Sequence, residues 1–211
     1  MISLKDDGLW WPDNDVGCKP WTEAESWIPG YIADVCDQLN IKKSNIIHAG
    51  GNVGKYALSY AEYFDAVYVA EPESINYACL EKNCAPIDNI KYFNVAFGDV
   101  NSTCSIKTAD ISNCGLYKIN NMDGAINMVT IDQLNISDVS VIHLDIEGFE
   151  LPALKGAVET IKINKPLIAV EANDKSDEYG YGIQQIREFL HSLGYNIERS
   201  YASEVMFYYE T

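Results

Sequence analysis

The sequence predicts an α/β fold in which a mostly parallel, twisted sheet carries helices on both faces. Apolar, β-branched segments alternate with helical patterns along most of the chain, as a parallel sheet requires. The last two predicted strands, 194–201 and 204–210, are joined only by Ala202-Ser203. Such a short connection forces an antiparallel pair, because a parallel crossover needs about a dozen residues or more. The length of 211 residues fits one folded unit.

The first 44 residues precede the alternating pattern and contain all four tryptophans, Trp10, Trp11, Trp21 and Trp27. We expect an aromatic arm followed by a helix over about 22–39, in which Pro29-Gly30 implies a kink or a break. Trp10 and Trp11 have two possible roles, covering a binding cleft or packing on the core. Residues 1–44 are therefore expected to form an arm and helix that pack on the domain formed by 45–211.

Residues 45–211 supply the sheet and most of its helices. The predicted strands are 46–51, 66–72, 90–98, 139–145 and 167–172, followed by the C-terminal pair, and the predicted helices are 55–64, 74–83, 150–163 and 182–193. Residues 100–138 are polar and rich in Asn and Ser, with strand-like segments at 105–108 and 128–131. This composition indicates an excursion over the sheet.

Charge and composition exclude several classes of partner. Acidic side chains outnumber basic ones by 31 to 15, for a formal net charge of −16, so we expect binding neither to nucleic acid nor to a membrane. No apolar segment is long enough to span a bilayer, and the acidic N-terminus is unlike a signal peptide. We therefore expect a soluble, cytoplasmic protein whose six cysteines are reduced.

A glycine-rich turn follows the first strand of the sheet domain and reads His48-Ala49-Gly50-Gly51-Asn52-Val53-Gly54. Glycines let a backbone approach a ligand closely, and the start of the next helix offers unpaired N–H groups. Glu71 ends the second strand, where a carboxylate accepts hydrogen bonds from both ribose hydroxyls of an adenosine. The turn and the acid together predict an adenine-containing cofactor, either NAD or S-adenosylmethionine (SAM).

Further segments follow in a fixed order along the chain. They are Glu71-Pro72, Leu80-Glu81-Lys82-Asn83, Asn94-Val95-Ala96-Phe97-Gly98-Asp99, Thr130-Ile131-Asp132-Gln133-Leu134 and, most specifically, His143-Leu144-Asp145-Ile146-Glu147-Gly148-Phe149-Glu150 continuing to Gly156. Together with the glycine-rich turn, they resemble the FkbM family of SAM-dependent methyltransferases over roughly residues 44–195. The resemblance implies a Rossmann-like class I methyltransferase fold with strand order 3-2-1-4-5-7-6 and an antiparallel last strand.

The resemblance also implies roles for individual residues. The expected cofactor-binding set is His48, Gly50, Gly51, Asn52, Gly54, Glu71, Pro72, Ala96, Asp99 and Asp145. Gly50, Asn52 and Gly54 would line the methionine end of SAM, and Glu71 would hold the ribose. Asp99 would lie near the adenine, although a plain turn residue fits its position equally well.

The expected catalytic set is Asp145, Glu147, Glu171 and His143, at the ends of neighbouring strands. A carboxylate there would serve as general base for a hydroxyl of a sugar or small metabolite, leaving S-adenosylhomocysteine as the second product. Glu147 could instead cap the helix that begins near Glu150. The carboxylates could also hold Mg²⁺, although no pattern in the sequence requires a metal.

Two positions depart from the family pattern together. His48 stands where the family usually has an acid, and His143 stands where it usually has Lys. The strands that carry them should be neighbours, so we predict that the two rings are in contact, with one neutral ring donating to the other. A pH-sensitive site and a metal pair are the alternatives. The segment Tyr179-Gly180-Tyr181-Gly182 is a second candidate for the rim of the cleft.

Two other functions stay open at the level of sequence. An NAD-dependent oxidoreductase would explain the turn and Glu71, but Ala49 replaces its first glycine and the C-terminal hairpin does not suit it. A non-catalytic relative would explain the altered His48 and His143, but Asn52, Glu71, Asp145 and Glu147 are all present. The identity of the methyl acceptor and the oligomeric state do not follow from the sequence.

Overall fold

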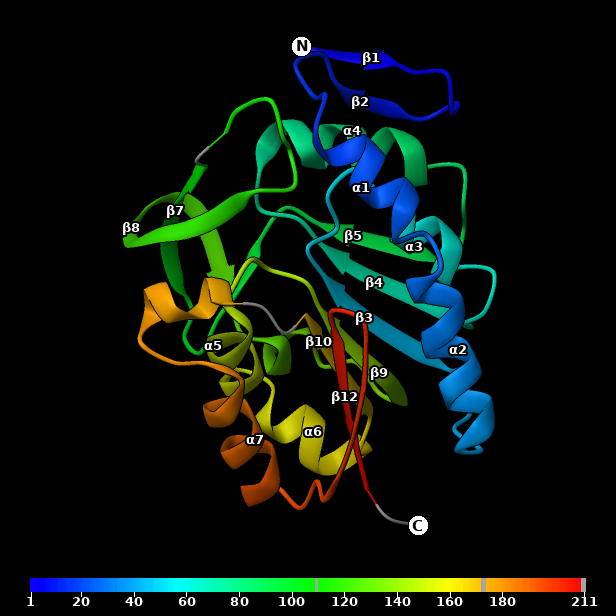
Figure 1. Cartoon of the computed structure of the whole chain (residues 1–211), viewed down its shortest axis with the longest axis vertical. Helices are drawn as coiled ribbons and strands as arrows, with labels where there is room; N and C mark the ends of the chain where they lie inside the picture. The colour runs from blue at the N-terminus through cyan, green and yellow to red at the C-terminus, as the bar shows by residue number, and fades with distance from the viewer. Residues whose placement is uncertain (109, 172–173, 210–211) are drawn as a thin grey trace.

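The computed structural model describes residues 1–108, 110–171 and 174–209, and a seven-stranded sheet forms its centre (Figure 1). The strand order is β11-β12-β10-β9-β3-β4-β5. These strands are β3 (Asn45–Ala49), β4 (Ala66–Ala70), β5 (Ile90–Phe93), β9 (Val139–Leu144), β10 (Leu167–Glu171), β11 (Ile197–Tyr201) and β12 (Glu204–Tyr208). The five neighbouring strands β5, β4, β3, β9 and β10 run parallel, so their carboxyl ends meet at one edge of the sheet.

Helices cover both faces of this sheet because its strand side chains alternate between two apolar clusters. Ile47 and Ile142 face α5 (Glu150–Lys155), α6 (Val158–Asn164) and α7 (Ile183–Ser192). Ile46 and Val141 face α2 (Ile28–Gln38), α3 (Lys55–Tyr60) and α4 (Ser74–Cys84). Figure 1 shows α2 and α3 on one side of the sheet and α5 to α7 on the other.

The C-terminal hairpin confirms the prediction made from its short connection. β12 pairs antiparallel with β11, and Tyr201 lies opposite Glu204 across the turn. β12 also pairs antiparallel with β10, so it lies inside the sheet while β11 forms the edge. The last residues of the predicted strands 167–172 and 204–210, Ala172 and Glu210, lie outside the described residues.

The strand predicted at 90–98 is wrong in extent, because the chain leaves the main sheet near its middle. The Asn94 side-chain amide donates to the carbonyls of Glu71 at 2.8 Å and Pro72 at 3.2 Å, which fixes a turn after β5. Beyond it, β6 (Ala96–Phe97) pairs with β8 (Tyr117–Val129). β8 and β7 (Ser102–Thr108) complete a separate three-stranded sheet, so the polar excursion is more regular than expected.

Two predicted helices are divided in the structure. The helix predicted at 150–163 breaks at Gly156, where a β-carbon would overlap the carbonyl oxygen of Gly98 and where the Gly156 carbonyl accepts the Asp132 N–H at 2.9 Å. The helix predicted at 22–39 starts earlier, as α1 (Cys18–Ala24), and breaks before α2 rather than at Pro29-Gly30. Pro29 lies in the first turn of α2, where the missing N–H removes no helical hydrogen bond.

The N-terminal arm forms a hairpin of β1 (Ile2–Leu4) and β2 (Trp10–Pro12), which the sequence did not indicate. The hairpin packs beside α4 (Figure 1), and Trp11 is fully buried in a cluster with Val53 and Cys79. Two 3₁₀ helices, η1 (Ile131–Leu134) and η2 (Asp174–Tyr179), complete the described fold. Within the described residues, no helix combines the length and the apolar character needed to cross a membrane.

Candidate active site

A cavity of about 450 Å³ opens at the carboxyl ends of the parallel strands, where ligands of open α/β sheets bind. Its wall combines the turn after β3, the ends of β4, β9 and β10, and parts of α1, α3 and the three-stranded sheet. Nine of the predicted site residues line it, namely Gly50, Gly51, Asn52, Glu71, Pro72, Ala96, Asp145, Glu147 and Glu171. The fold therefore brings together most of the residues that the sequence singled out.

The turn after β3 requires glycine at position 50. Gly50 has a φ of +87°, and a β-carbon there would overlap the carbonyl oxygen of Asp145. Close by, the Asp145 N–H donates to the Ala49 carbonyl at 3.1 Å, so the ends of β3 and β9 are held together. The small residue thus brings Asp145 against the turn that follows β3.

Glu71 lies at one end of the cavity, buried and fixed by two backbone donors. Its carboxylate accepts the N–H of Asn52 and the N–H of Glu73, each at 2.8 Å. Burial raises the pKa of Glu71 to about 8, although both hydrogen bonds act to lower it. Because each carboxylate oxygen has two lone pairs, acceptor capacity remains for a ligand.

Asn76 adds a second acceptor beside Glu71 that sequence reasoning missed. It lies in the first turn of α4, is 2% exposed and lines the cavity. Its amide nitrogen donates to the Cys114 carbonyl at 2.7 Å, while its side-chain oxygen has no hydrogen-bond partner among the described residues. A buried polar atom without a partner is costly, so a ligand donor is the natural partner for this oxygen.

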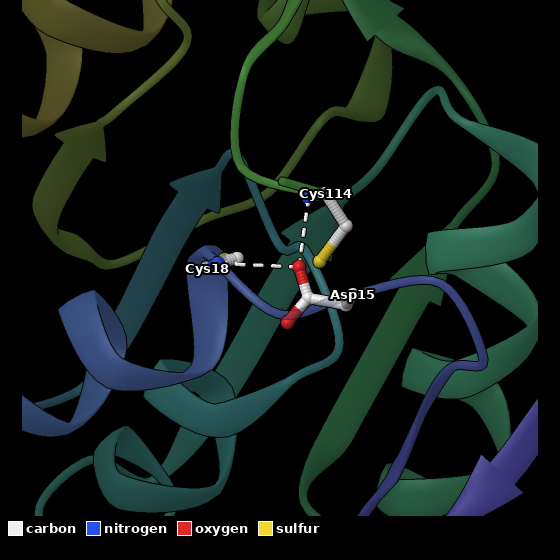
Figure 2. Close-up of side chains that lie close together, drawn as sticks. All are labelled: Asp15, Cys18 and Cys114. Carbon is white, nitrogen blue, oxygen red and sulfur yellow. Dashed lines mark hydrogen bonds between the residues drawn. The ribbon is translucent and has the colours of Figure 1, made fainter. Parts of the chain in front are cut away.

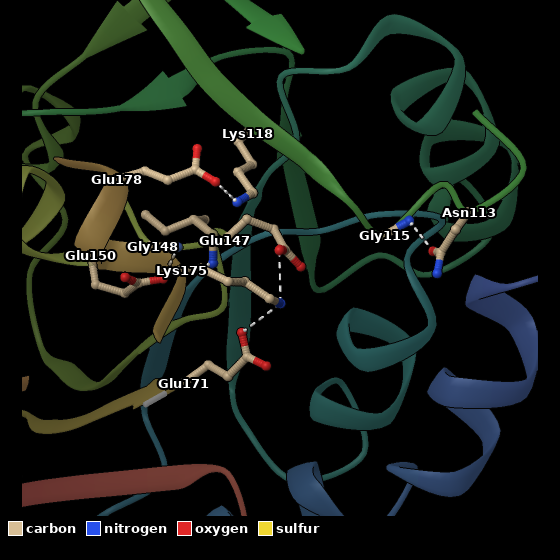
Figure 3. Close-up of polar contacts among 10 residues, drawn as sticks. Asn113, Gly115, Lys118, Glu147, Gly148, Glu150, Glu171, Lys175 and Glu178 are labelled. Carbon is tan, nitrogen blue, oxygen red and sulfur yellow. Dashed lines mark hydrogen bonds and ion pairs between the residues drawn. The ribbon is translucent and has the colours of Figure 1, made fainter. Parts of the chain in front are cut away.

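Three carboxylates and one ammonium group form the other end of the cavity, and Figure 3 shows Lys175 between two of them, Glu147 and Glu171. Carboxylate oxygens of Asp145, Glu147 and Glu171 lie within 4.8 Å of one another. The Lys175 Nζ lies 2.7 Å from Glu147 Oε2 and 3.4 Å from Glu171 Oε2. The carboxylates are close enough to share a divalent cation, but Lys175 already supplies a positive charge between two of them.

The protonation of this cluster follows from burial and from its own charges. Burial raises the pKa of Asp145, and the nearby Glu171, Glu204 and Glu147 raise it further. Burial also raises the pKa of Glu147, while Lys175 acts in the opposite direction. Burial lowers the pKa of Lys175, but the surrounding carboxylates outweigh it and leave this pKa above its ordinary value. Lys175 therefore stays charged and favours the ionised form of Glu147.

The family of the chain follows from its sequence, together with this geometry. A family model described as the methyltransferase FkbM domain matches residues 48–197, which is more than half of the chain. The chain belongs to the FkbM methyltransferase family. A search of curated proteins found no significant match.

Solved structures show the same fold in other methyltransferases. The FkbM methyltransferase from Methylobacillus flagellatus KT is 20% identical with a TM-score of 0.58, over 79% of this chain and 44% of that one. This chain therefore spans less than half the length of that protein. A SAM-dependent methyltransferase from Aquifex aeolicus is 13% identical with a TM-score of 0.51, over 89% of this chain and 91% of that one. At these identities the likeness concerns the α/β fold with its mixed sheet.

Four residues predicted for the site of this FkbM protein do not line the cavity: Gly54, Asp99, His48 and His143. Gly54 starts α3 with a φ of +92°, and a β-carbon there would lie 2.8 Å from the Cys84 sulfur, so packing explains this glycine. Asp99 is exposed and lies outside the cavity, because the chain turns away from the main sheet before reaching it. The predicted ligand contacts of these two residues do not fit the structure.

The two histidines are in contact, as predicted, but not in the predicted way. Their rings stack with centroids 4.8 Å apart and planes 12° apart. Among the described contacts none is a hydrogen bond between the rings: His143 Nδ1 bonds the Tyr60 hydroxyl at 2.8 Å, and its Nε2 faces Glu204 at 3.4 Å. Alternation along the strands points both rings away from the cavity, toward Tyr56 and Tyr60 of α3. A direct role for either ring with a ligand is therefore not supported.

His48 is buried too deeply to serve as a simple pH sensor. Both histidines are 0% exposed. Burial, and the neighbouring His143, hold the pKa of His48 well below its usual range. His48 therefore stays neutral at ordinary pH, as one half of a packed aromatic pair beneath the turn.

The cap alternative for Glu147 is also wrong. Glu147 has a φ of +59° and turns its carboxylate toward Lys175. The neighbouring Glu150 holds the turn instead, because its Oε1 accepts the N–H of Gly148 at 3.0 Å and that of Ile146 at 3.3 Å (Figure 3). The left-handed backbone of Glu147 is thus held by the turn that places its side chain in the cavity.

The tryptophan that lines the cavity is not one of the aromatic residues proposed from the sequence for the cleft. Trp10 and Trp11 pack on the core, and Tyr179 and Tyr181 do not line the cavity. Trp21 does line it, from α1, and remains 65% exposed. The sequence placed all four tryptophans in the arm but offered no signal to distinguish Trp21, because α1 was predicted to start after it.

Proposed function

We propose that this FkbM-family protein transfers the methyl group of SAM to a hydroxyl of a sugar or another small metabolite. The observation that carries the proposal is one cavity that joins the Glu71 end to the carboxylate cluster of Asp145, Glu147 and Glu171. The remaining lone pairs of Glu71 and the unpartnered oxygen of Asn76 suit the hydroxyl and amine donors of an adenosine. The residues present therefore fit SAM.

Bound SAM would supply an electrophilic methyl group. The chain would supply position and proton transfer. Gly50 and Asn52 would hold the methionine end, and Glu71 the ribose. The turn at Gly50 brings Asp145 toward the same point, which favours an acceptor held in line with the methyl group.

A hydroxyl is a poor nucleophile until its proton leaves, so the acceptor needs a base within hydrogen-bond reach. Glu147 suits this role because Lys175 favours its ionised form while burial makes it a stronger base than an exposed carboxylate. A positioned base contributes about 10²–10⁴-fold to the rate. Trp21 offers a flat apolar face at the same cavity, suited to the face of a sugar ring.

Calorimetry with S-adenosylhomocysteine tests the cofactor. We expect binding by the wild type and at least about 30-fold weaker binding by Glu71→Gln, since losing hydrogen bonds to a charged acceptor costs about 2 kcal/mol or more. Glu81→Gln makes the same substitution at an exposed glutamate on α4 and should bind normally. A well-folded wild type that binds NAD instead, or neither compound, would contradict the proposal.

Turnover of neutral sugars and other hydroxyl acceptors tests the chemistry. Glu147→Gln should bind S-adenosylhomocysteine normally but transfer methyl groups about 10²-fold more slowly. Glu178→Gln is the matched control, because Glu178 pairs with Lys118 outside the cavity. Equal rates for Glu147→Gln and wild type would reject Glu147 as the base. Cofactor binding without turnover of any hydroxyl acceptor would favour a non-catalytic relative.

A further inference from the structure

Two cysteines from distant parts of the chain meet at the wall of the cavity, Cys18 at the start of α1 and Cys114 before β8 (Figure 2). Their sulfur atoms and a carboxylate oxygen of Asp15 lie within 4.8 Å of one another. Both cysteines are unpaired and buried, and both line the cavity. A small molecule in the cavity can therefore reach sulfurs that bulk solvent does not.

Hydrogen bonds from the backbone hold the segments that carry Cys18 and Cys114 together. The N–H groups of Val16 and Gly17 donate to the Ser112 carbonyl at 2.9 and 3.1 Å. The Asp15 carboxylate oxygen Oδ1 accepts the N–H of Cys18 at 3.2 Å and that of Cys114 at 3.0 Å, as Figure 2 shows. Because these bonds already join the two segments, a covalent link between the sulfurs would lose little further chain entropy.

The two thiols are chemically unequal, which favours attack by one of them. The adjacent Cys114 thiol lowers the pKa of Cys18, and contacts from Thr22 and Asn52 act in the same direction. Burial instead raises the pKa of Cys36 to about 12, as it does for Cys84. Cys18 is thus the better nucleophile, since the thiolate is the reactive form.

We propose that Cys18 and Cys114 form a modification site at which hydrogen peroxide converts the two thiols into an intramolecular disulfide. The Cys18 sulfur attacks one peroxide oxygen, the O–O bond breaks, and the Cys18 thiol becomes a sulfenic acid while water leaves. The Cys114 sulfur then attacks the Cys18 sulfur, and the sulfenic hydroxyl leaves with the Cys114 proton as the second water. Two thiols are oxidised, one peroxide is reduced, and two molecules of water form.

The disulfide would act directly on the wall of the cavity. The Asn52 amide group contacts both sulfurs, with its nitrogen 3.3 Å from Cys18 and its oxygen 3.5 Å from Cys114. Joining the sulfurs removes the thiol proton donated to that oxygen and fixes α1, with Trp21, against the segment before β8. This consequence rests on the proposed function, because it matters only if Asn52 and Trp21 face a ligand.

Treatment of the reduced, ligand-free protein with hydrogen peroxide tests the site. We expect the intact mass to fall by two hydrogen atoms and digestion to release one linked peptide pair containing Cys18 and Cys114. A thiol reductant should reverse both changes. Cys18→Ser and Cys114→Ser should each abolish the link, whereas Cys104→Ala, at a buried cysteine that does not line the cavity, should retain it. Peptide mapping of the wild type keeps the test valid even if a serine variant folds poorly.

Results that contradict the disulfide site differ from those that contradict the cofactor proposal. A different cysteine pair, a link between two chains, or oxidation of single cysteines to sulfinic acid would overturn the proposal. Saturating S-adenosylhomocysteine should slow the linkage because it fills the cavity beside the sulfurs. Linkage that forms readily but ignores S-adenosylhomocysteine would uphold the disulfide site and count against the cofactor proposal alone.

Discussion

Replacing Gly50 by alanine should destabilise the protein more than the same replacement at an exposed glycine with a positive φ. The substitution places a methyl side chain on a residue with a φ of +87°, which costs about 1–2 kcal/mol. Its β-carbon would also overlap the Asp145 carbonyl oxygen and lie 2.8 Å from the carbonyl carbon, where only backbone movement gives relief. Overpacking of this kind adds about 1–3 kcal/mol, so we expect a loss of about 2–5 kcal/mol.

Urea unfolding followed by tryptophan fluorescence measures this loss, with Gly180→Ala as the matched control. Gly180 has a similar φ of +79°, but a β-carbon there meets nothing within 4 Å. The control should therefore lose only the backbone cost of about 1–2 kcal/mol. Equal losses for the two variants would refute the claim that the close approach of the β3 turn to Asp145 excludes every side chain at position 50.

Three further predictions concern charge and hydrogen bonding. Lys175→Met should move the acid limb of the pH–rate profile of methyl transfer about 1–2 pH units upward, because Glu147 loses a cation 2.7 Å away that lowers its pKa. Lys175→Arg should restore the profile, and an unmoved acid limb in Lys175→Met would contradict the pairing of Lys175 with Glu147. S-adenosylhomocysteine binding at pH 7 should release roughly one proton, and fewer as the pH rises through 8, because the ribose hydroxyls need an ionised Glu71 and the pKa of Glu71 is about 8. Calorimetry in buffers of different ionisation enthalpy measures this release, and uptake of a proton would contradict the assignment of Glu71 to the ribose. His143→Leu should lower the free energy of unfolding by about 1–3 kcal/mol more than His48→Leu, because it removes a 2.8 Å hydrogen bond from the buried Tyr60 hydroxyl, whereas His48 Nδ1 makes only a 3.4 Å contact with the His143 carbonyl. Equal losses would show that only the stacking of the two rings contributes.

The parts of the fold that the sequence predicted are those where one local rule decides the outcome. The Ala202-Ser203 connection leaves no geometry other than a hairpin, and the structure has one. The turn at Gly50 and the acid at Glu71 follow adjacent parallel strands, so their meeting at one cavity follows from topology. Neighbouring strands likewise place His48 opposite His143.

What the sequence did not predict depends on contacts between distant segments. Asn94 ends β5 by bonding the carbonyls of Glu71 and Pro72, and no local pattern announces that bond. Lys175 reaches the carboxylates from a 3₁₀ helix that has no apolar periodicity to reveal it. The resemblance gives the position of each histidine along its strand but not the face of the sheet to which its ring points. Alternation along the strands places both rings beside Tyr60, behind the cavity.

The charges at the cavity limit the acceptor that the proposed reaction can use. An anionic group beside Glu147 and Glu171 would meet two carboxylates and one ammonium group, with Asp145 close behind. Two like charges about 4 Å apart repel by up to about 4 kcal/mol in a partly buried site, so Lys175 alone does not offset the cluster. A neutral hydroxyl compound can instead donate hydrogen bonds to the same oxygens, and in doing so it presents the very proton that a base must remove. We therefore expect neutral polyhydroxylated acceptors to be used, and phosphorylated or carboxylated ones to be rejected at the cavity itself.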